Sequence, residues 1–260
     1  MNIAARIGAL RSTAVNRVLA EARQVQAEGR ALVSLMRGQP DTPTPAFIVE
    51  AAEIALRAGR TGYADNRGEP GLRQAVVEKL ARDNGVTYDP NREILITDGA
   101  TCGISTALAV LLRPGDEVLL PEPIYDAYAS PIALWGGRAV YARSWIDARG
   151  RFNVSRAALE AVCTPRTRVL LLNSPWNPVG TVFTRGELEA IVDFANQHDL
   201  VIISDEIYEM LVYDGLRHIS PASLSDAARA RTVIVNSLSK TYAMTGWRVG
   251  YCAGPAEIIE

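Results

Sequence analysis

The sequence is poor in the residues that build disulfide frameworks and metal sites. Its three cysteines, Cys102, Cys163 and Cys252, are an odd number and include no Cys-x-x-Cys pair. We therefore expect reduced thiols, as in a cytoplasmic protein. The two histidines, His198 and His218, have no cysteine or histidine at the spacing of zinc ligands, so no metal site is expected.

Long hydrophobic runs and blocks of like charge are also missing. No apolar run reaches the roughly 18 residues that a membrane-spanning helix needs, so no membrane partner is expected. The chain has 27 Lys and Arg against 29 Asp and Glu, a net charge of −2, which gives no electrostatic basis for binding nucleic acid. With 48% hydrophobic and 22% charged residues, the composition is typical of a globular protein.

Turn residues and helical periodicity divide the first 90 residues. Apolar residues recur at helical spacing behind Ser12, a candidate N-cap, and predict an amphipathic helix. Three prolines within residues 38–45 predict an extended loop. Pro70 begins a run of good helix formers and Gly85 closes it, which predicts a helix over Leu72 to Asp83.

Short apolar runs alternate with helical stretches from about residue 92 onward. Six runs predict strands: Glu93–Thr97, Glu117–Leu120, Arg168–Leu172, Leu200–Ser204, Thr232–Asn236 and Val249–Ala253. Because these runs are continuously apolar, we expect an α/β fold with a mostly parallel sheet and helices on both faces. Thr184 and Glu187 have the spacing of a capping box, which predicts a helix to about His198.

Polar residues follow several of the predicted strands directly. Ligands of mostly parallel sheets bind beyond the carboxyl ends of the strands. Gly99–Thr101, Asn177, Asp205 and Ser237 each come just after a predicted strand. We therefore expect these residues, which are distant in sequence, to meet at one edge of the sheet.

Lys240 and Asp205 are the residues with the most distinctive chemistry. A lysine amine condenses with an aldehyde only when it is partly neutral, which requires desolvation or a nearby positive charge such as Arg248. A carboxylate at the mouth of a buried strand needs a partner, and a protonated pyridine nitrogen is one. Taken alone, Lys240 would strongly favour an ordinary surface lysine, and Asp205 would be equally consistent with a helix N-cap.

Further polar groups follow the same strands and complete a site for an aromatic ring. Tyr208 lies three residues after Asp205, which is one helical turn on the same face, so its phenol and Asn177 could both reach a ring oxygen. Tyr125 follows another strand, where its ring could stack on a pyridine face. The simpler explanations are core tyrosines for Tyr208 and Tyr125, and a turn residue before Pro178 for Asn177.

Donors for a phosphate lie between a predicted strand and a predicted helix. Free backbone N–H groups at Gly99, Ala100 and Thr101 would meet an anion at the N-terminus of that helix. Ser237 and Arg248 could add charge-assisted hydrogen bonds. Together with the ring contacts, these groups describe a site for pyridoxal 5′-phosphate.

The motifs resemble those of the fold-type I pyridoxal-phosphate enzymes, the class I/II aminotransferases of the aspartate aminotransferase group. The resemblance runs from Gly38-Gln-Pro-Asp41 to Gly246-Trp-Arg248-Val-Gly250. It implies the large domain of that fold, with a seven-stranded type of sheet. It also implies catalytic roles for three residues: Lys240 would carry the Schiff base and shuttle the proton, and Asp205 and Tyr208 would act on the cofactor.

The remaining roles implied by the resemblance concern cofactor, substrate and partner contacts. Tyr208 and Asn177 would bind the ring oxygen O3′, and Tyr125 would stack on the ring. The phosphate would be held by Ala100, Thr101, Ser237 and Arg248. Gly38 and Asn177 would contact the substrate. Tyr63 would reach the phosphate of a neighbouring subunit, which implies a homodimer.

Two residues depart from the family pattern, and so does the length of the chain. Trp176 stands where the family usually has a small or an amide residue. Val179 stands where it usually has a threonine or serine. The chain stops at Glu260, whereas family members continue through a small domain that supplies the arginine for the substrate carboxylate. We therefore expect residues 1–45 to be the N-terminal helix and arm, residues 46–260 the cofactor-binding large domain, and this chain alone to bind cofactor weakly or to be inactive.

The function implied is transfer of an amino group between an amino acid and a 2-oxo acid. The preferred amino acid is not predicted. A lyase of the same fold would share the cofactor contacts, and a non-catalytic regulatory module would need a DNA-binding domain, of which no basic helix-turn-helix precedes residue 38. A serine hydrolase is suggested by the Ser237-x-x-Lys240 spacing, but its companion motifs are missing from the sequence.

Overall fold

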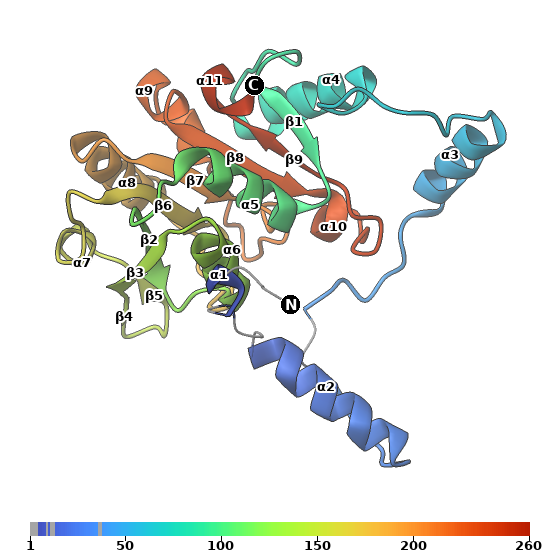
Figure 1. Cartoon of the computed structure of the whole chain (residues 1–260), viewed down its shortest axis with the longest axis horizontal. Helices are drawn as coiled ribbons and strands as arrows, with labels where there is room; N and C mark the ends of the chain where they lie inside the picture. The colour runs from blue at the N-terminus through green and yellow to red at the C-terminus, as the bar shows by residue number, and fades with distance from the viewer. Residues whose placement is uncertain (1–4, 9, 11–13, 36–37) are drawn as a thin grey trace.

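A seven-stranded sheet forms the centre of the computed structural model, which describes residues 5–8, 10, 14–35 and 38–260. The strand order is β1-β9-β8-β7-β6-β2-β3 (Figure 1). The strands are β1 Ile94–Thr97, β2 Glu117–Glu122, β3 Arg138–Arg143, β6 Thr167–Asn173, β7 Val201–Asp205, β8 Thr232–Ser237 and β9 Gly250–Ala253. Strands β3, β2, β6, β7 and β8 pair in parallel, and β9 is antiparallel to both β8 and β1. The predicted mostly parallel α/β fold is confirmed.

All six predicted strands are present, and β3 is the sheet strand that the sequence did not reveal. Strand β3 lies at the edge of the sheet, and its exposed ends are Arg138 and Arg143. Most of its residues are exposed or half-buried, so it lacks the continuous apolar run on which the prediction depended. A short antiparallel hairpin of β4 (Trp145–Ile146) and β5 (Phe152–Asn153) follows it.

Helices cover both faces of the sheet, as predicted. On one face α5 (Ala100–Leu111) and α6 (Ala129–Leu134) pack over Val169 and Leu171. On the other face α7 (Arg156–Glu160), α8 (Arg185–Gln197) and α9 (Asp226–Arg229) pack over Leu170 and Leu172. Neighbouring residues of β6 thus point into opposite cores, which explains why the strand is apolar throughout.

Helix ends follow the local signals in the sequence. The Thr184 hydroxyl accepts from the Glu187 backbone N–H, and the Glu187 carboxylate accepts from the Thr184 N–H at 2.7 Å, which confirms the capping box. Helix α4 (Pro70–Lys79) begins at the predicted proline. It continues as a π-helical turn, Leu80–Asn84, that ends at Gly85 with φ of 68°.

Helices α2 (Ala14–Ala27) and α3 (Ala46–Arg57) stand apart from the sheet, whereas α1 (Ala5–Gly8) lies against α6 (Figure 1). Helix α2 is the predicted amphipathic helix; its candidate N-cap Ser12 lies outside the described residues. Every residue of α2 and of α3 is at least partly exposed. Residues 38–45, predicted as an extended loop, form neither helix nor strand, and the Thr44 hydroxyl donates to the Ala243 carbonyl at 2.8 Å. Among the described residues, no helix is both long and apolar enough to cross a membrane.

Candidate active site

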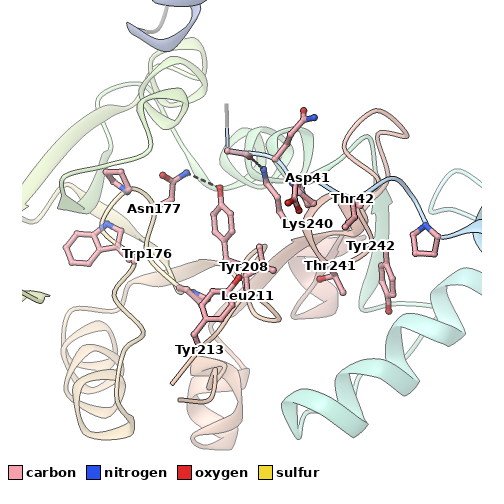
Figure 2. Close-up of a pocket in the computed structure, with 18 residues that line it drawn as sticks. Asp41, Thr42, Trp176, Asn177, Tyr208, Leu211, Tyr213, Lys240, Thr241 and Tyr242 are labelled. Atoms are coloured by element: carbon pink, nitrogen blue, oxygen red, sulfur yellow. Dashed lines mark hydrogen bonds between the residues drawn. The ribbon is translucent and has the colours of Figure 1, made fainter. Parts of the chain in front are cut away.

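The carboxyl ends of three neighbouring strands bring the predicted site residues together. Strands β6, β7 and β8 end at Asn173, Asp205 and Ser237. The Asn173 side-chain amide donates to the Asp205 backbone oxygen at 2.9 Å, and its oxygen accepts from the Asn177 N–H at 2.7 Å. Beside this edge lies a pocket of about 780 Å³, lined among others by Gly38, Asn177, Tyr208 and Lys240 (Figure 2).

Lys240 lies on the short helix α10 (Leu238–Thr241) and is half-buried. Burial lowers the pKa of its amine below the ordinary lysine value, as the predicted chemistry requires. Its Nζ donates to the Gly38 carbonyl and lies 5.7 Å from the centre of the Tyr208 ring. The other of the two lysines in the sequence, Lys79, is paired with Glu209 away from the pocket lining.

Asp205 is buried, and its carboxylate has neutral partners. Oδ2 accepts from the Tyr128 hydroxyl at 2.6 Å, and Oδ1 accepts from the Ile207 N–H at 3.2 Å. Burial raises the pKa of Asp205 to about 6. Residues 207–210 form a turn rather than a helix. The helix N-cap explanation for Asp205 is therefore wrong, and so is the helical turn assumed between Asp205 and Tyr208.

Tyr208 and Asn177 meet across the pocket. The Asn177 side-chain amide donates to the Tyr208 hydroxyl at 3.0 Å, and the contact is drawn in Figure 2. Burial, followed by the nearby Asp205 carboxylate, raises the pKa of the Tyr208 phenol to about 12. Tyr208 therefore keeps its proton at neutral pH and can donate a hydrogen bond.

Tyr125 lies near Asp205, because its ring contacts Tyr128, whose hydroxyl binds the Asp205 carboxylate. It is partly exposed, and its ring meets the Tyr128 ring edge to face at a centroid distance of 5.4 Å. The raised pKa of Tyr125 comes first from burial and then from the neighbouring carboxylates of Asp126 and Asp205. A partly exposed ring is free to stack on a ligand in a way that a core aromatic residue is not.

Tyr128 and Asn173 are site residues that the sequence reasoning missed. Tyr128 is buried and binds the Asp205 side chain, while Asn173 binds its backbone. A sequence signal existed for each, since Tyr128 follows Tyr125 by three residues and Asn173 ends an apolar run. Both signals are also those of ordinary core residues.

The start of α5 and the side chain of Arg248 lie together. Gly99 precedes the helix with φ of 85°, so Ala100 and Thr101 occupy its first turn. The Arg248 guanidinium donates to the backbone oxygens of Thr245 at 2.9 Å and of Asp98 at 3.3 Å. A positive side chain and a helix N-terminus therefore meet at one point, a favourable arrangement for an anion.

Ser237 and Tyr63, unlike Lys240, Tyr208 and Asn177, do not line the pocket. Ser237 is buried, and its hydroxyl accepts from the Ser239 N–H at 3.1 Å and donates to the Val249 carbonyl at 2.8 Å. Tyr63 is fully exposed in the segment between α3 and α4, and it is not among the residues that line the pocket. The phosphate contact of Ser237 and the intersubunit role of Tyr63 stay predictions.

Trp176, one of the two departures from the family pattern, links two loops of the site. Its ring stacks on Phe183 at 5.6 Å, and its indole N–H donates to the Pro123 carbonyl at 2.8 Å. Pro123 lies two residues before Tyr125, and Trp176 lies next to Asn177. The tryptophan therefore fixes the Tyr125 loop relative to the Asn177 loop.

A mostly parallel sheet with a pocket beside the carboxyl ends of its strands defines an α/β protein of the kind that binds ligands at this edge. The model of the family described as aminotransferase class I and II matches residues 30–260. The chain belongs to this family.

Similar proteins include two with different named activities. An aspartate aminotransferase of Geobacillus stearothermophilus is 39% identical over the whole chain, which covers 65% of that protein. An aromatic-amino-acid aminotransferase of Thermococcus litoralis is 44% identical over 88% of the chain and 58% of that protein. The solved structure of Thermus thermophilus aspartate aminotransferase with maleate has a TM-score of 0.93 at 37% identity, over all of the chain and 66% of that protein. The chain thus spans about three fifths to two thirds of the length of these relatives.

Proposed function

We propose that the protein is a pyridoxal-phosphate-dependent aminotransferase that moves an amino group between an amino acid and a 2-oxo acid. Family membership supports this, since aspartate aminotransferases depend on that cofactor. The observation that carries the proposal is the half-buried Lys240 amine with its lowered pKa, in a pocket shared with Tyr208 and Asn177. The relatives differ in their named substrates, so the preferred amino acid is left open.

The groups around the pocket fit the three chemical parts of the cofactor. The buried Asp205 carboxylate has only neutral hydrogen-bond donors among the described residues, so a cationic ring nitrogen would compensate its burial. The Tyr208 hydroxyl and the Asn177 amide suit a phenolate-type oxygen. Arg248 and the first turn of α5 suit a phosphate. When bound, pyridoxal phosphate supplies an aldehyde carbon for the amino group and a cationic ring that takes up the electron pair of the substrate α-carbon.

Lys240 is assigned the proton transfer. Because burial lowers its pKa, its amine is neutral for more of the time than that of a solvated lysine, and a neutral amine can accept the α-proton of the substrate. The protonated amine can then release the proton to a neighbouring carbon. The Gly38 carbonyl, which accepts from Nζ, orients the amine within the pocket.

Asp205, Tyr208 and Asn177 are assigned electrostatic roles. Asp205 would hold the ring nitrogen in its protonated form, and Tyr128 and the Ile207 N–H orient its carboxylate. Tyr208 keeps its proton because its pKa is about 12, and so it can donate to an oxygen anion. These groups are fixed before the reaction, so they stabilise developing charge without further reorganisation.

The product of one turnover is the direct test of this function. We expect the full-length, cofactor-loaded protein to convert an amino acid, tested first with aspartate and with phenylalanine, into the 2-oxo acid and the aminated cofactor in equal amounts. The full-length protein is used because these 260 residues alone are expected to bind cofactor weakly or to be inactive. Absorbance changes of the cofactor and chromatography of the oxo acid measure the two products. Release of ammonia in place of the aminated cofactor would contradict transamination and indicate a lyase of the same fold.

Gly99→Ala tests the phosphate end of the site. A Cβ at Gly99 would clash with Nη2 of Arg248 and would hold an alanine at φ of 85°, which costs about 1–2 kcal/mol. We expect affinity for pyridoxal 5′-phosphate to fall roughly tenfold or more, because hydrogen bonds to a charged group contribute about 1.5–3 kcal/mol each. Calorimetric titration measures the affinity. Gly186→Ala, where no atom lies within 4 Å of the new Cβ, is the control, and equal affinities in the two variants would contradict the assignment.

We also propose a cytoplasmic homodimer in which Tyr63 of one subunit reaches the phosphate of the other. Its complete exposure outside the pocket of its own chain supports a role in another subunit. We likewise propose that residues 1–45 form an arm and residues 46–260 the cofactor-binding domain, since α2 stands apart from the sheet. Sedimentation analysis of the protein tests the dimer; a monomer with full cofactor affinity would contradict it.

A further inference from the structure

The turn that follows Asp205 has two chemically different sides. Asp205 is bound to Tyr128, and Tyr208 lines the pocket. Glu206 and Glu209 alternate with them along the chain, yet both are buried, with side-chain exposures of 0% and 5%. The same short segment therefore presents two groups to the site and two carboxylates to the interior behind it. The assigned reaction uses neither Glu206 nor Glu209.

Glu206 has all of its acceptor positions filled. Oε1 accepts from the Ser204 hydroxyl at 2.9 Å and the Ser220 hydroxyl at 2.7 Å. Oε2 lies 2.9 Å from Nε2 of His218 and 3.3 Å from the Asn84 amide. Burial alone would raise the pKa of Glu206, but His218 and the two hydroxyls outweigh burial and hold it below the usual value.

Glu209 is held by residues from three other elements: α4, the π-helical turn that follows it, and β8. Oε1 accepts from the Lys79 ammonium and, at 2.8 Å, from the Asn236 amide of β8. Oε2 accepts from the Asn84 amide at 2.9 Å. Lys79 also donates to the Asn84 side-chain oxygen at 2.7 Å. Asn84 thus connects the two carboxylates, and we call this group of eight residues the carboxylate anchor: Lys79, Asn84, Ser204, Glu206, Glu209, His218, Ser220 and Asn236.

The π-helical turn Leu80–Asn84 positions the two side chains, Lys79 and Asn84, that donate to Glu209 from this part of the chain. Lys79 ends α4, and Asn84 ends the π-helical turn directly before Gly85. The wider turn brings side chains five residues apart onto Glu209 together. Such turns are uncommon and occur frequently at functional sites. The anchor is therefore built with a local irregularity rather than with regular helix geometry.

The cost of the anchor argues against a purely structural purpose. Removing a charged group from water costs several kcal/mol, and apolar residues of similar volume often stabilise a fold as well or better. Ligand atoms of Glu206, Glu209 and His218 lie within 4.8 Å of one another, but the Lys79 ammonium and the Asn84 amide already occupy the space and supply the positive charge. The advantage of these buried carboxylates over apolar residues is therefore a fixed geometry, because each carboxylate oxygen accepts hydrogen bonds from defined directions.

We propose that the carboxylate anchor is a positioning device that holds the turn of residues 206–209 so that Asp205 and Tyr208 face the cofactor. The proposal rests on the proposed function. Burial is the main cause of the raised pKa of Asp205, and the negative charge of the neighbouring Glu206 adds to it. His218 and Ser220 come from the segment after Leu211 and Tyr213, which line the pocket. The anchor therefore links one wall of the pocket to the turn.

The proposal is tested by comparing Glu209→Gln with a control variant that has the same melting temperature. Glu209→Gln keeps the shape of the side chain but removes the charge that faces Lys79. Leu188→Ala, on the buried face of α8, lowers stability without touching the anchor. Two measurements are made on the protein: the dissociation constant for pyridoxal 5′-phosphate, and the pH midpoint of the bound cofactor's absorbance. Turnover is measured alongside.

We expect Glu209→Gln to weaken cofactor affinity about tenfold, to move the absorbance midpoint and to reduce turnover by roughly 10- to 100-fold, because small displacements of reacting groups are costly. Leu188→Ala at a matched melting temperature should leave the midpoint and affinity unchanged. If Glu209→Gln does not fold, Ser220→Ala, which removes one hydroxyl from Glu206, should show a smaller shift of the same kind.

Three results separate the possible failures. If both variants match the wild-type affinity and midpoint, the anchor is structural and the proposal is overturned. If Leu188→Ala shifts the midpoint as much as Glu209→Gln, the effect belongs to general instability and the proposal is likewise overturned. If the wild-type protein does not bind pyridoxal 5′-phosphate, the proposed function fails, and the assigned role of the anchor fails with it.

Discussion

Lys240→Ala is expected to abolish covalent attachment of pyridoxal phosphate and to lower turnover by about 10⁴-fold, because one residue supplies both the nucleophile and the acid–base group. The cofactor phosphate would still bind, since Arg248 and the first turn of α5 are unchanged. Borohydride reduction followed by mass spectrometry of the peptides measures the attachment. A steady-state assay of oxo acid measures turnover.

The chain allows an unusually clear reading of that experiment. It has two lysines, so a covalent label can appear on only two lysine peptides. Lys79 is bound to Glu209 and Asn84, which makes it a poor nucleophile. Lys240→Arg, which keeps the positive charge without the nucleophilic amine, is the matched variant and should fail in the same way. Label on the Lys79 peptide of the wild type, or label that persists in Lys240→Ala, would contradict the assignment.

Asp205→Asn is expected to change activity and stability in opposite directions. Turnover should fall by about 10²- to 10³-fold, the usual cost of removing one fixed electrostatic group at a reacting centre. The cofactor-free protein should gain stability above pH 6, because the asparagine removes a buried negative charge whose hydrogen-bond donors are neutral. A kinetic assay and thermal unfolding between pH 4 and pH 8, with Asp193→Asn on the exposed side of α8 as control, measure the two effects.

The sign of the stability change follows from the pKa of Asp205. Its folded-state value of about 6 lies above the ordinary 3.8, so the folded protein keeps the proton to a higher pH than the unfolded chain does. The stabilisation is complete below about pH 3.8 and is lost as pH rises through 6. The difference corresponds to about 3 kcal/mol, less about 1 kcal/mol for a hydrogen bond that the asparagine cannot replace. A gain that is as large at pH 4 as at pH 8 would contradict this account.

The central strands of the sheet could be predicted from the sequence because they are buried along most of their length. Strands β6, β7 and β8 are buried on both faces, so their continuous apolar runs marked them, and their ends located Asp205 and Ser237. Strand β3 has mostly exposed or half-buried residues, with an arginine at each end, and gave no such run. The family followed from motifs spread along the chain, and the match over residues 30–260 confirms it.

The remaining features that could not be predicted from the sequence depend on contacts between residues that are far apart along the chain. The helical turn assumed after Asp205 was wrong because the Glu206 backbone N–H bonds to Val235 of the next strand, a contact between residues far apart in sequence. Tyr128 has the pattern of a core tyrosine until its hydroxyl is seen to bind Asp205. Glu206 and Glu209 have the pattern of surface acids, since their partners lie as far away as Lys79 and Asn236. The roles of the individual site residues remain predictions.

The scarcity of lysine has a practical consequence for handling the protein. Arginine carries almost all of the positive charge, since two of the 27 basic residues are lysines. Lys79 is largely buried and Lys240 is half-buried in the pocket. An amine-reactive dye, cross-linker or immobilisation resin thus finds few side-chain amines on the surface of these 260 residues. Such a reagent would mark the pocket, and attachment through lysine would block the site that it was meant to display.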